Sequence, residues 1–281
     1  MALFKASFLS DSFQRNVSVN VLLPSDTPLP PGQTRDWGPY KTLYLLHGLR
    51  GDCDSWLTNS NIQRYSMLFN IAVVMPDGCN AFYVDQPHST VQGSRYIGEE
   101  LIEFTRKTFP LSDKREDTIL GGLSMGGYGT LYNSLKHGDV FGHAIALSTP
   151  VKVIRYESEC EPKETGFRLT PGFFETLHGD LASIDETDRN IAKQAKKVLE
   201  TGKPVTNLYM ACGYNDSLVP ENRELHEKLT DMGFPHKYEE GPGTHDWPFF
   251  SDYLYHGLAY VLGKPQIPPH PFWVEKTDYN V

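Results

Sequence analysis

The stretch "GGLSMGGYGT", Gly121 to Thr130, contains the pattern G-x-S-x-G at Gly122, Ser124 and Gly126. The pattern is a weak signal by itself, because a glycine turn with a bystander serine produces it as well. Its surroundings strengthen it, since a strand-like apolar run precedes it and a helical pattern follows. A serine on such a strand-to-helix turn is typical of a nucleophile elbow, whose glycines let the strand and helix backbones pass close together. We therefore interpret Ser124 as a candidate nucleophile.

Strand-like and helix-like segments alternate along most of the chain. Short apolar runs between turn residues are typical of strands buried on both faces of a parallel sheet, and apolar residues at helical spacing are typical of the helices between them. The predicted strands span Asn16–Leu23, Lys41–Gly48, Asn70–Gly78, Asp117–Ser124, Phe141–Pro150, Pro204–Gly213 and His236–Glu240. The predicted helices span Asn61–Phe69, Arg95–Phe109, Tyr128–Asp139, Arg189–Glu200, Pro220–Gly233 and His245–Leu262. This order predicts a doubly wound, mostly parallel α/β sheet.

Two helix ends carry recognisable capping residues. Gly138 is the expected C-cap of the helix that follows the candidate nucleophile, and Asp246 is the expected N-cap of the last helix. The 281 residues are enough for one large α/β domain, so we expect residues 1–281 to form a single domain. Residues from about 150 to 203 interrupt the alternation and are expected to form a small insertion or cap. The proline-rich tail, residues 264–281, is expected to pack outside the core.

Composition excludes several classes of function. The net charge of −9 argues against binding to nucleic acids and to anionic membranes. No apolar run is long enough to span a membrane, and no secretory signal is visible, which favours a cytoplasmic protein. A signal already removed from the chain would leave the same sequence. The four cysteines show no C-x-x-C pattern and no clustering with histidine, so we expect no metal site and no cofactor; they are Cys53, Cys79, Cys160 and Cys212.

A serine nucleophile needs a histidine base and a carboxylate that orients it, and in this fold class the chain order is Ser, Asp or Glu, then His. Asp216 lies in "LYMACGYNDSLVP", in a loop after a late predicted strand, although a plain turn aspartate would look the same. His245 lies in "YEEGPGTHDWPFF", after the last strand and at the start of the last helix. The other histidines after Asp216 lie within helices, at a strand start or in the tail; they are His226, His236, His256 and His270. We therefore predict the triad Ser124, Asp216 and His245.

An oxyanion hole requires two backbone N–H groups aimed at the developing negative oxygen. One is expected from Met125, which follows the nucleophile, and the other from Leu49 in "LLHGLRGD", after an earlier strand. His47 precedes the nucleophile along the chain, so it is interpreted as a structural hydrogen-bonding residue. The aromatic side chains near these loops are either walls of a substrate pocket or ordinary packing residues; they are Trp56, Tyr83, Trp247 and Phe250.

Together these residues resemble the esterase D-like α/β-hydrolases, most closely the bacterial tributyrin-esterase branch. The resemblance covers nearly the whole chain and rests on "MALFKASFLSDSFQRNVSVNVLLP", "LYLLHGLRGDCDSWLTNSNIQRY", "VVMPDG", "GLSMGGYG", "CGYNDSL" and "GTHDWPFF". It implies an α/β-hydrolase fold with Ser124 as nucleophile, Asp216 as acid and His245 as base. Leu49 and Met125 would form the oxyanion hole. Members of this family hydrolyse short acyl esters, acetylated sugars, feruloyl esters or S-formylglutathione.

The expected function is therefore that of a serine carboxylesterase acting on short-chain acyl esters, from acetyl to butyryl, through an acyl-enzyme on Ser124. Its partner would be a small-molecule or oligosaccharide ester, and the resemblance leaves a homo-oligomer open. Three alternatives remain at this point. They are a thioesterase of the S-formylglutathione hydrolase type, an acyltransferase, and a non-catalytic binding protein on the same scaffold.

Overall fold

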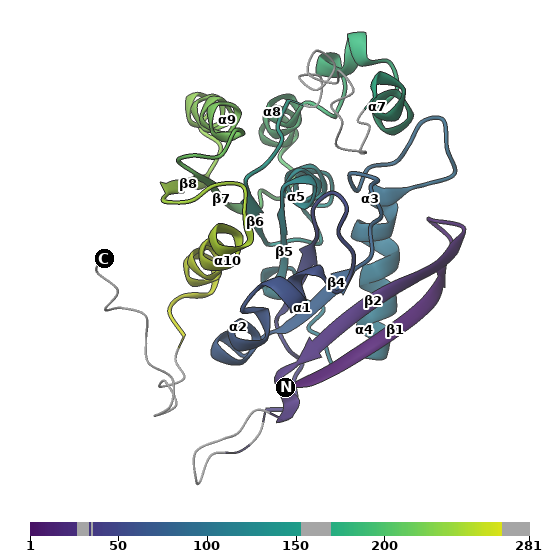
Figure 1. The fold of residues 1–281 in the computed structure, drawn as a ribbon, viewed down its shortest axis with the longest axis vertical. Helices are drawn as coiled ribbons and strands as arrows, with labels where there is room; N and C mark the ends of the chain where they lie inside the picture. The colour runs from purple at the N-terminus through teal and green to yellow at the C-terminus, as the bar shows by residue number, and fades with distance from the viewer. Residues whose placement is uncertain (27–33, 35, 153–169, 266–281) are drawn as a thin grey trace.

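The computed structural model describes residues 1–26, 34, 36–152 and 170–265. Its centre is an eight-stranded sheet in the order β1-β2-β4-β3-β5-β6-β7-β8 (Figure 1). Strands β3 to β8 run parallel, whereas β2 is antiparallel to both β1 and β4. The strands are β1 (Ala2–Ser10), β2 (Arg15–Leu23), β3 (Thr42–Leu46), β4 (Ala72–Pro76), β5 (Thr118–Leu123), β6 (His143–Leu147), β7 (Asn207–Gly213) and β8 (His236–Gly241). The predicted α/β fold class is confirmed.

Helices cover both faces of this sheet. They are α1 (Ser55–Asn59), α2 (Ile62–Phe69), α3 (Gly93–Arg95), α4 (Leu101–Thr108), α5 (Met125–Lys136), α7 (Pro171–His178), α8 (Ile191–Thr201), α9 (Val219–Asp231) and α10 (Trp247–Leu262). Side chains of a strand alternate between the faces, so one strand feeds two cores. In β3, Leu43 and Leu45 pack in the core of α2 and α10, whereas Tyr44 and Leu46 pack in the core of α4 and α5. This alternation explains why β3 is buried along its whole length.

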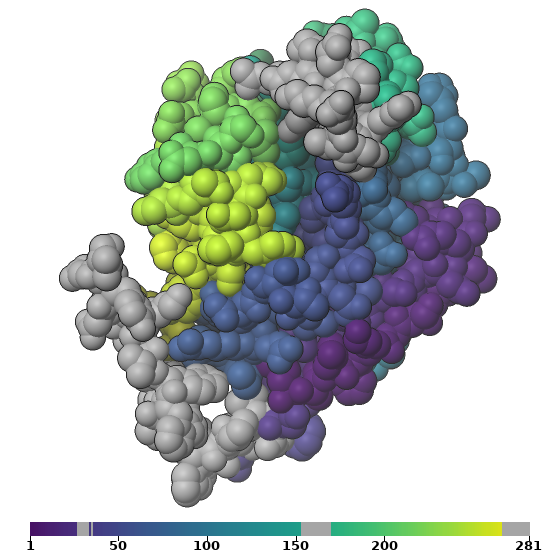
Figure 2. Space-filling model, in the orientation of Figure 1, coloured from purple at the N-terminus to yellow at the C-terminus, as the bar shows by residue number. Residues whose placement is uncertain are grey.

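The sequence predicted most of these elements but missed the first strand. β1 forms the outer edge of the sheet, and the N-terminal strands lie at the surface of the molecule (Figure 2, purple). Its exposed face carries Leu3 and Leu9, so apolar and polar residues do not alternate as they do in a half-buried strand. The long helix predicted over Arg95–Phe109 is divided into α3, a π-helical turn at Tyr96–Glu100, and α4.

The two predicted caps had different outcomes. The Asp246 carboxylate accepts a hydrogen bond from the Phe249 N–H at 3.1 Å and so caps α10 as predicted. The C-cap of α5 is His137, so the prediction for Gly138 is wrong. Gly138 serves a close approach instead, because a Cβ at this position would lie 2.4 Å from the Pro204 carbonyl oxygen.

Of the predicted insertion, the structure describes residues 150–152 and 170–203. There α7 is followed by a 3-10 turn at Leu181–Glu186 and by α8, which contacts α5 and α9. Residues 153–169 and most of the proline-rich tail lie outside the described residues, so the cap and the tail stay predictions. Among the residues that the structure describes, no helix is long and apolar enough to cross a membrane.

Helix α7 carries a buried histidine at its end. The ring of His178 packs against Phe82, Tyr128 and Phe174. Within the described chain neither of its ring nitrogens has a hydrogen-bond partner. Burial, assisted by the charge of Arg189, lowers the pKa of His178 to about 3.

Replacing His178→Phe should therefore flatten the acid dependence of stability. An unfolded histidine has a pKa of about 6.5, so between this pH and about 3 the unfolded chain binds a proton that the folded chain does not. As the pH is lowered through this range, the wild-type free energy of unfolding should consequently fall by about 1.4 kcal/mol per pH unit because of His178. Urea unfolding of both proteins from pH 7 to pH 4 measures the difference; parallel curves would contradict the assignment.

Candidate active site

Ser124 lies on a sharp turn between β5 and α5. Its backbone is in a left-handed conformation, φ 51° and ψ −121°, which non-glycine residues rarely adopt. The Ser124 N–H donates to the Leu147 carbonyl of the neighbouring strand at 2.9 Å, and the Ser124 carbonyl accepts from the Tyr128 N–H at 3.0 Å. The strained conformation is thus fixed on both sides, as is common at functional sites.

Two glycines make this turn sterically feasible. A Cβ added to Gly122 would lie 2.4 Å from the Gly126 carbonyl oxygen, and a Cβ added to Gly126 would lie 2.5 Å from the Leu46 carbonyl oxygen. Both contacts are with backbone atoms that cannot move aside. The pattern G-x-S-x-G therefore reflects the close passage of β5, α5 and the end of β3.

The structure brings His245 and Asp216 to this serine. His245 Nε2 lies 3.0 Å from Ser124 Oγ, and His245 Nδ1 lies 2.8 Å from Asp216 Oδ2. Ser124 follows β5, Asp216 follows β7 and His245 follows β8, so the three residues come together at the carboxyl ends of parallel strands. His226 and His236 form a hydrogen bond with each other instead, with 2.8 Å between Nδ1 of His226 and Nε2 of His236.

The surroundings of Asp216 keep its carboxylate ionised. Burial acts most strongly and by itself would raise the pKa, but the hydrogen bond and charge of His245, together with the Leu218 N–H at 2.9 Å, bring the pKa of Asp216 below its ordinary value. An ionised carboxylate can only accept hydrogen bonds. His245 Nδ1 therefore carries the proton, which leaves Nε2 free to accept one from the Ser124 hydroxyl.

The loop after β3 lies directly against the serine. A Cβ added to Gly48 would lie 3.4 Å from the Ser124 Cβ. Leu49 follows in this loop, and Met125 is the first residue of α5, where helix N–H groups have no intrahelical partner. Within the described residues, no hydrogen bond is formed by the N–H of either residue. Both groups are therefore available to a ligand beside Ser124.

Hydrogen bonds from two side chains, the buried His47 and the partly buried Asn80, hold the loop in this shape. His47 Nδ1 donates to the Gly48 carbonyl at 2.8 Å, while His47 Nε2 accepts from the Gly78 N–H at 3.0 Å. The ring is therefore fixed in one tautomer, and His47 is a structural hydrogen-bonding residue as the sequence indicated. Arg50, whose φ is 65°, donates its N–H to Asn80 Oδ1 at 2.7 Å.

Sequence reasoning missed Asn80. This residue follows "PDGC" at the carboxyl end of β4, and β4 lies beside β3 in the sheet. Because the carboxyl ends of neighbouring parallel strands meet at one edge, a polar residue in this loop can reach the loop after β3. The position of "PDGCN" after a predicted parallel strand was the available signal.

The four predicted pocket aromatics fall into two groups. Trp56 is 1% exposed and donates its indole N–H to the Leu46 carbonyl, and Tyr83 is 0% exposed and donates its hydroxyl to the His47 carbonyl. These two side chains brace the loop and do not face an open pocket. Phe250 packs edge-on against His245 at 5.1 Å between ring centroids, and Trp247 packs against both Trp56 and Phe250.

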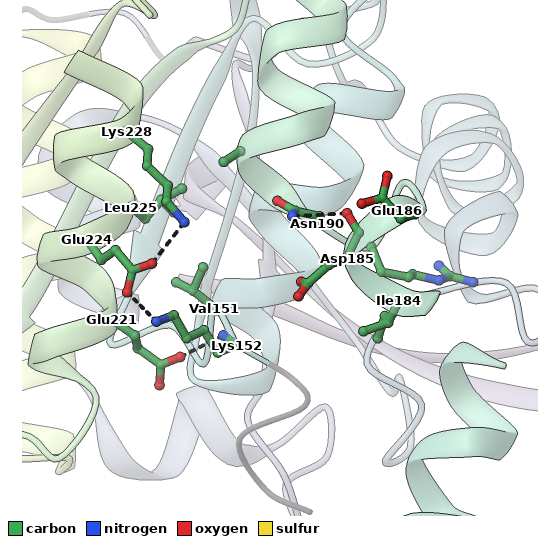
Figure 3. Close-up of a pocket in the computed structure, with 12 residues that line it drawn as sticks. Val151, Lys152, Ile184, Asp185, Glu186, Asn190, Glu221, Glu224, Leu225 and Lys228 are labelled. Carbon is green, nitrogen blue, oxygen red and sulfur yellow. Dashed lines mark hydrogen bonds and ion pairs between the residues drawn. The ribbon is translucent and has the colours of Figure 1, made fainter. Parts of the chain in front are cut away.

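The described residues also line cavities away from this group. One of about 600 Å³ lies between α9 on one side and the segment Ile184–Asn190 on the other, and it contains none of the three triad residues (Figure 3). Its walls are charged, and hydrogen bonds from Lys152 and Lys228 lower the pKa of Glu224 to about 2. A second cavity of about 310 Å³ is largely apolar. Asn80, which accepts a hydrogen bond from the loop after β3, is one of its lining residues.

Comparison with known proteins gives consistent results. The model of a family described as "Putative esterase" matches residues 10–261. An acetyl esterase of Caldicellulosiruptor saccharolyticus is 36% identical over 262 residues, which cover 93% of this chain and 98% of that protein. The substrate-bound structure of the serine hydrolase FphF from Staphylococcus aureus has a TM-score of 0.80 at 28% identity, with 93% and 98% of the chains covered. The S-formylglutathione hydrolase FrmB of the same organism has a TM-score of 0.79 at 27% identity, with the same coverage.

The steric account of the turn at Ser124 predicts different effects on stability when each of two glycines is replaced by alanine. Gly126→Ala should lower the free energy of unfolding by about 1–3 kcal/mol, because its Cβ would meet the backbone of β3. Gly172→Ala in α7 is the control, since a Cβ there meets nothing within 4 Å, and it should stay within about 0.5 kcal/mol of the wild type. Urea unfolding measures both. Equal stability of the two variants would contradict the account.

Proposed function

We propose that this chain cleaves short-chain acyl esters through an acyl-enzyme on Ser124. The proposal starts from two facts: the chain belongs to the esterase family whose model matches it, and it is a carboxylic ester hydrolase. The observation that carries the proposal is the chain of two contacts from Ser124 Oγ through the His245 ring to Asp216. It gives the serine a base and gives that base a fixed tautomer and orientation.

In the first half of the reaction, Ser124 Oγ attacks the ester carbonyl and His245 Nε2 takes the hydroxyl proton. Asp216 stabilises the imidazolium that forms but does not itself become protonated. The carbonyl oxygen becomes an oxyanion that accepts hydrogen bonds from the Leu49 and Met125 N–H groups, and the start of α5 adds its positive end. His245 then donates its proton to the leaving alcohol.

In the second half, water replaces the alcohol. His245 Nε2 takes a proton from this water, which attacks the acyl carbonyl on Ser124, and the same N–H groups hold the second oxyanion. The carboxylic acid leaves when the proton returns to Ser124 Oγ. Every step uses water and groups of this chain alone.

The acyl group is proposed to range from acetyl to butyryl. Support comes from the relative named acetyl esterase, which matches nearly the whole chain. Phe250 is buried against His245, and Trp247, which packs on Phe250 and is only partly buried, offers apolar surface to a short acyl or alcohol group. Acetylated sugars, including oligosaccharide esters, and feruloyl esters are further candidate substrates. Initial rates with these esters compare them with the short-chain acyl esters.

A second candidate activity is hydrolysis of S-formylglutathione. The similarity to FrmB favours it, since that protein is named for this reaction. The same triad would attack a thioester carbonyl. Comparison of kcat/KM for S-formylglutathione and for an acetyl ester distinguishes the two, because the ester must be the better substrate if the proposed function is correct.

Triad substitutions should abolish turnover without unfolding the protein. Ser124→Ala should lower kcat for p-nitrophenyl acetate by about 10⁶-fold. Asp216→Asn should lower it by about 10⁴-fold, because an amide cannot hold the His245 tautomer that leaves Nε2 as acceptor. Initial rates measure both, with thermal melting as a folding check. Ser89→Ala, at an exposed serine, is the control and should retain full activity. A Ser124→Ala variant with more than about 1% of wild-type kcat would refute the nucleophile assignment.

Asn80 should act on the reaction through the loop that it holds. Asn80→Ala removes the acceptor of the Arg50 N–H and releases the peptide next to Leu49, so kcat should fall by about 10- to 100-fold. KM should change much less, because the lost stabilisation is that of the oxyanion. Asn59→Ala, which alters exposed hydrogen bonds within α1, is the matched control. A change in KM alone would show that Asn80 serves binding and not the oxyanion loop.

A further inference from the structure

Strand β1 is unusually apolar for an exposed element. Of the six large hydrophobic side chains exposed among the described residues, three lie on this one strand: Leu9 at 70%, Phe4 at 44% and Leu3 at 43%. The other three are scattered over the surface; they are Trp37, Tyr214 and Tyr260. Contiguous exposed apolar residues mark interaction surfaces more often than isolated ones do.

The same strand has an open edge. β1 pairs along its whole length, Ala2–Ser10, with β2, and within the described residues no strand lies on its other side. Its outward N–H and C=O groups therefore form a template for another strand. The opposite edge of the sheet differs, because β8 is shorter and carries Lys237, Glu239 and Glu240. Charged residues of this kind protect an edge strand, whereas β1 carries only Lys5, whose charge is paired with Asp54 at 2.7 Å.

Two copies of β1 that run antiparallel place complementary side chains opposite each other. Antiparallel pairing about a twofold axis at Ala6 places Leu3 of one copy opposite Leu9 of the other, and Phe4 opposite Phe8. Lys5 then lies opposite Ser7. A register shifted by two residues toward the N-terminus would instead place the two Lys5 side chains opposite each other, which is unfavourable.

We propose that β1 is the contact of a homodimer in which two copies of this chain pair antiparallel through Ala2–Ser10 and join their eight-stranded sheets. Such an interface uses one patch twice, as twofold symmetry requires. On one face the exposed leucines cover each other. On the other face Phe4 and Phe8, which already pack on Phe109 and Phe104 of the α4 region, extend that aromatic cluster across the axis.

The dimer leaves the catalytic group open in each copy. Figure 1 shows β1 at the outer margin of the molecule, and the sheet order separates it from β5 by three strands. Dimer formation should therefore not alter the esterase reaction. The proposal is independent of the proposed function, and the activity of each variant serves as a check that it is folded.

Light scattering during size-exclusion chromatography tests the contact and its register. Wild-type protein should have the mass of a dimer. The double variant Leu3→Lys/Leu9→Lys places like charges opposite each other and should be monomeric with wild-type activity. Leu3→Glu/Leu9→Lys places opposite charges together at both sites and should remain a dimer. Lys237→Glu on β8 is the control for the other edge and should also remain a dimer.

Two single substitutions provide a second test if the double variant Leu3→Lys/Leu9→Lys does not fold. Ser7→Lys lies opposite Lys5 of the other copy, whereas Ser7→Glu lies opposite the same lysine with favourable charge. The dissociation constant of the Ser7→Lys dimer should exceed that of the Ser7→Glu dimer by about 10-fold or more. A monomeric wild-type protein would overturn the proposal. So would a dimer that Lys237→Glu disrupts, or one whose dissociation constant is equal in the two Ser7 variants.

Discussion

The close approach of backbone atoms at the turn after β5 is the constraint on which the group Ser124, His245 and Asp216 depends. Gly122 lies against Gly126, and Gly126 lies against the end of β3, so no side chain fits at either position. This contact forces Ser124 into its left-handed conformation and sets α5 directly behind it. The strain is maintained because hydrogen bonds on both sides of Ser124 anchor it to β6 and to α5. The serine hydroxyl is consequently held at the carboxyl edge of the sheet with little freedom to move.

The parallel sheet supplies the partners of this serine from distant parts of the sequence. The loops after β3, β5, β7 and β8 meet at one edge, so the loop that contains Leu49 converges there with Ser124, Asp216 and His245. Electrostatics then fixes which nitrogen of His245 carries the proton. The buried Asp216 stays ionised because His245 and the Leu218 N–H compensate for its burial, and the ionised carboxylate sets the tautomer of His245. A buried hydrogen bond of His47 and a more exposed one of Asn80 hold the remaining loop in place.

The sequence predicted the residues whose positions follow from strand order. Ser124, Asp216 and His245 each follow a predicted strand, and the topology brings such positions together. Features that depend on packing were not predictable in this way. β1 lacks a half-buried pattern because leucines lie on its exposed face, and Gly138 was assigned to a cap although it serves contact with Pro204. Trp56 and Tyr83 lie in loops near the serine, but only the fold shows that their polar atoms bond to the backbone of β3 and its loop.

The most direct test of this account is a search for the acyl group on Ser124 during turnover. Rapid mixing with p-nitrophenyl acetate should release a burst of nitrophenol equal to the concentration of active sites, and acid quenching followed by peptide mass analysis should find the acetyl group on Ser124. The account predicts both when deacylation is slower than acylation, a condition that the p-nitrophenyl ester favours because p-nitrophenolate is a far better leaving group than an ordinary alkoxide. An acetyl group on another residue, or hydrolysis without any acylated protein under these conditions, would contradict the account.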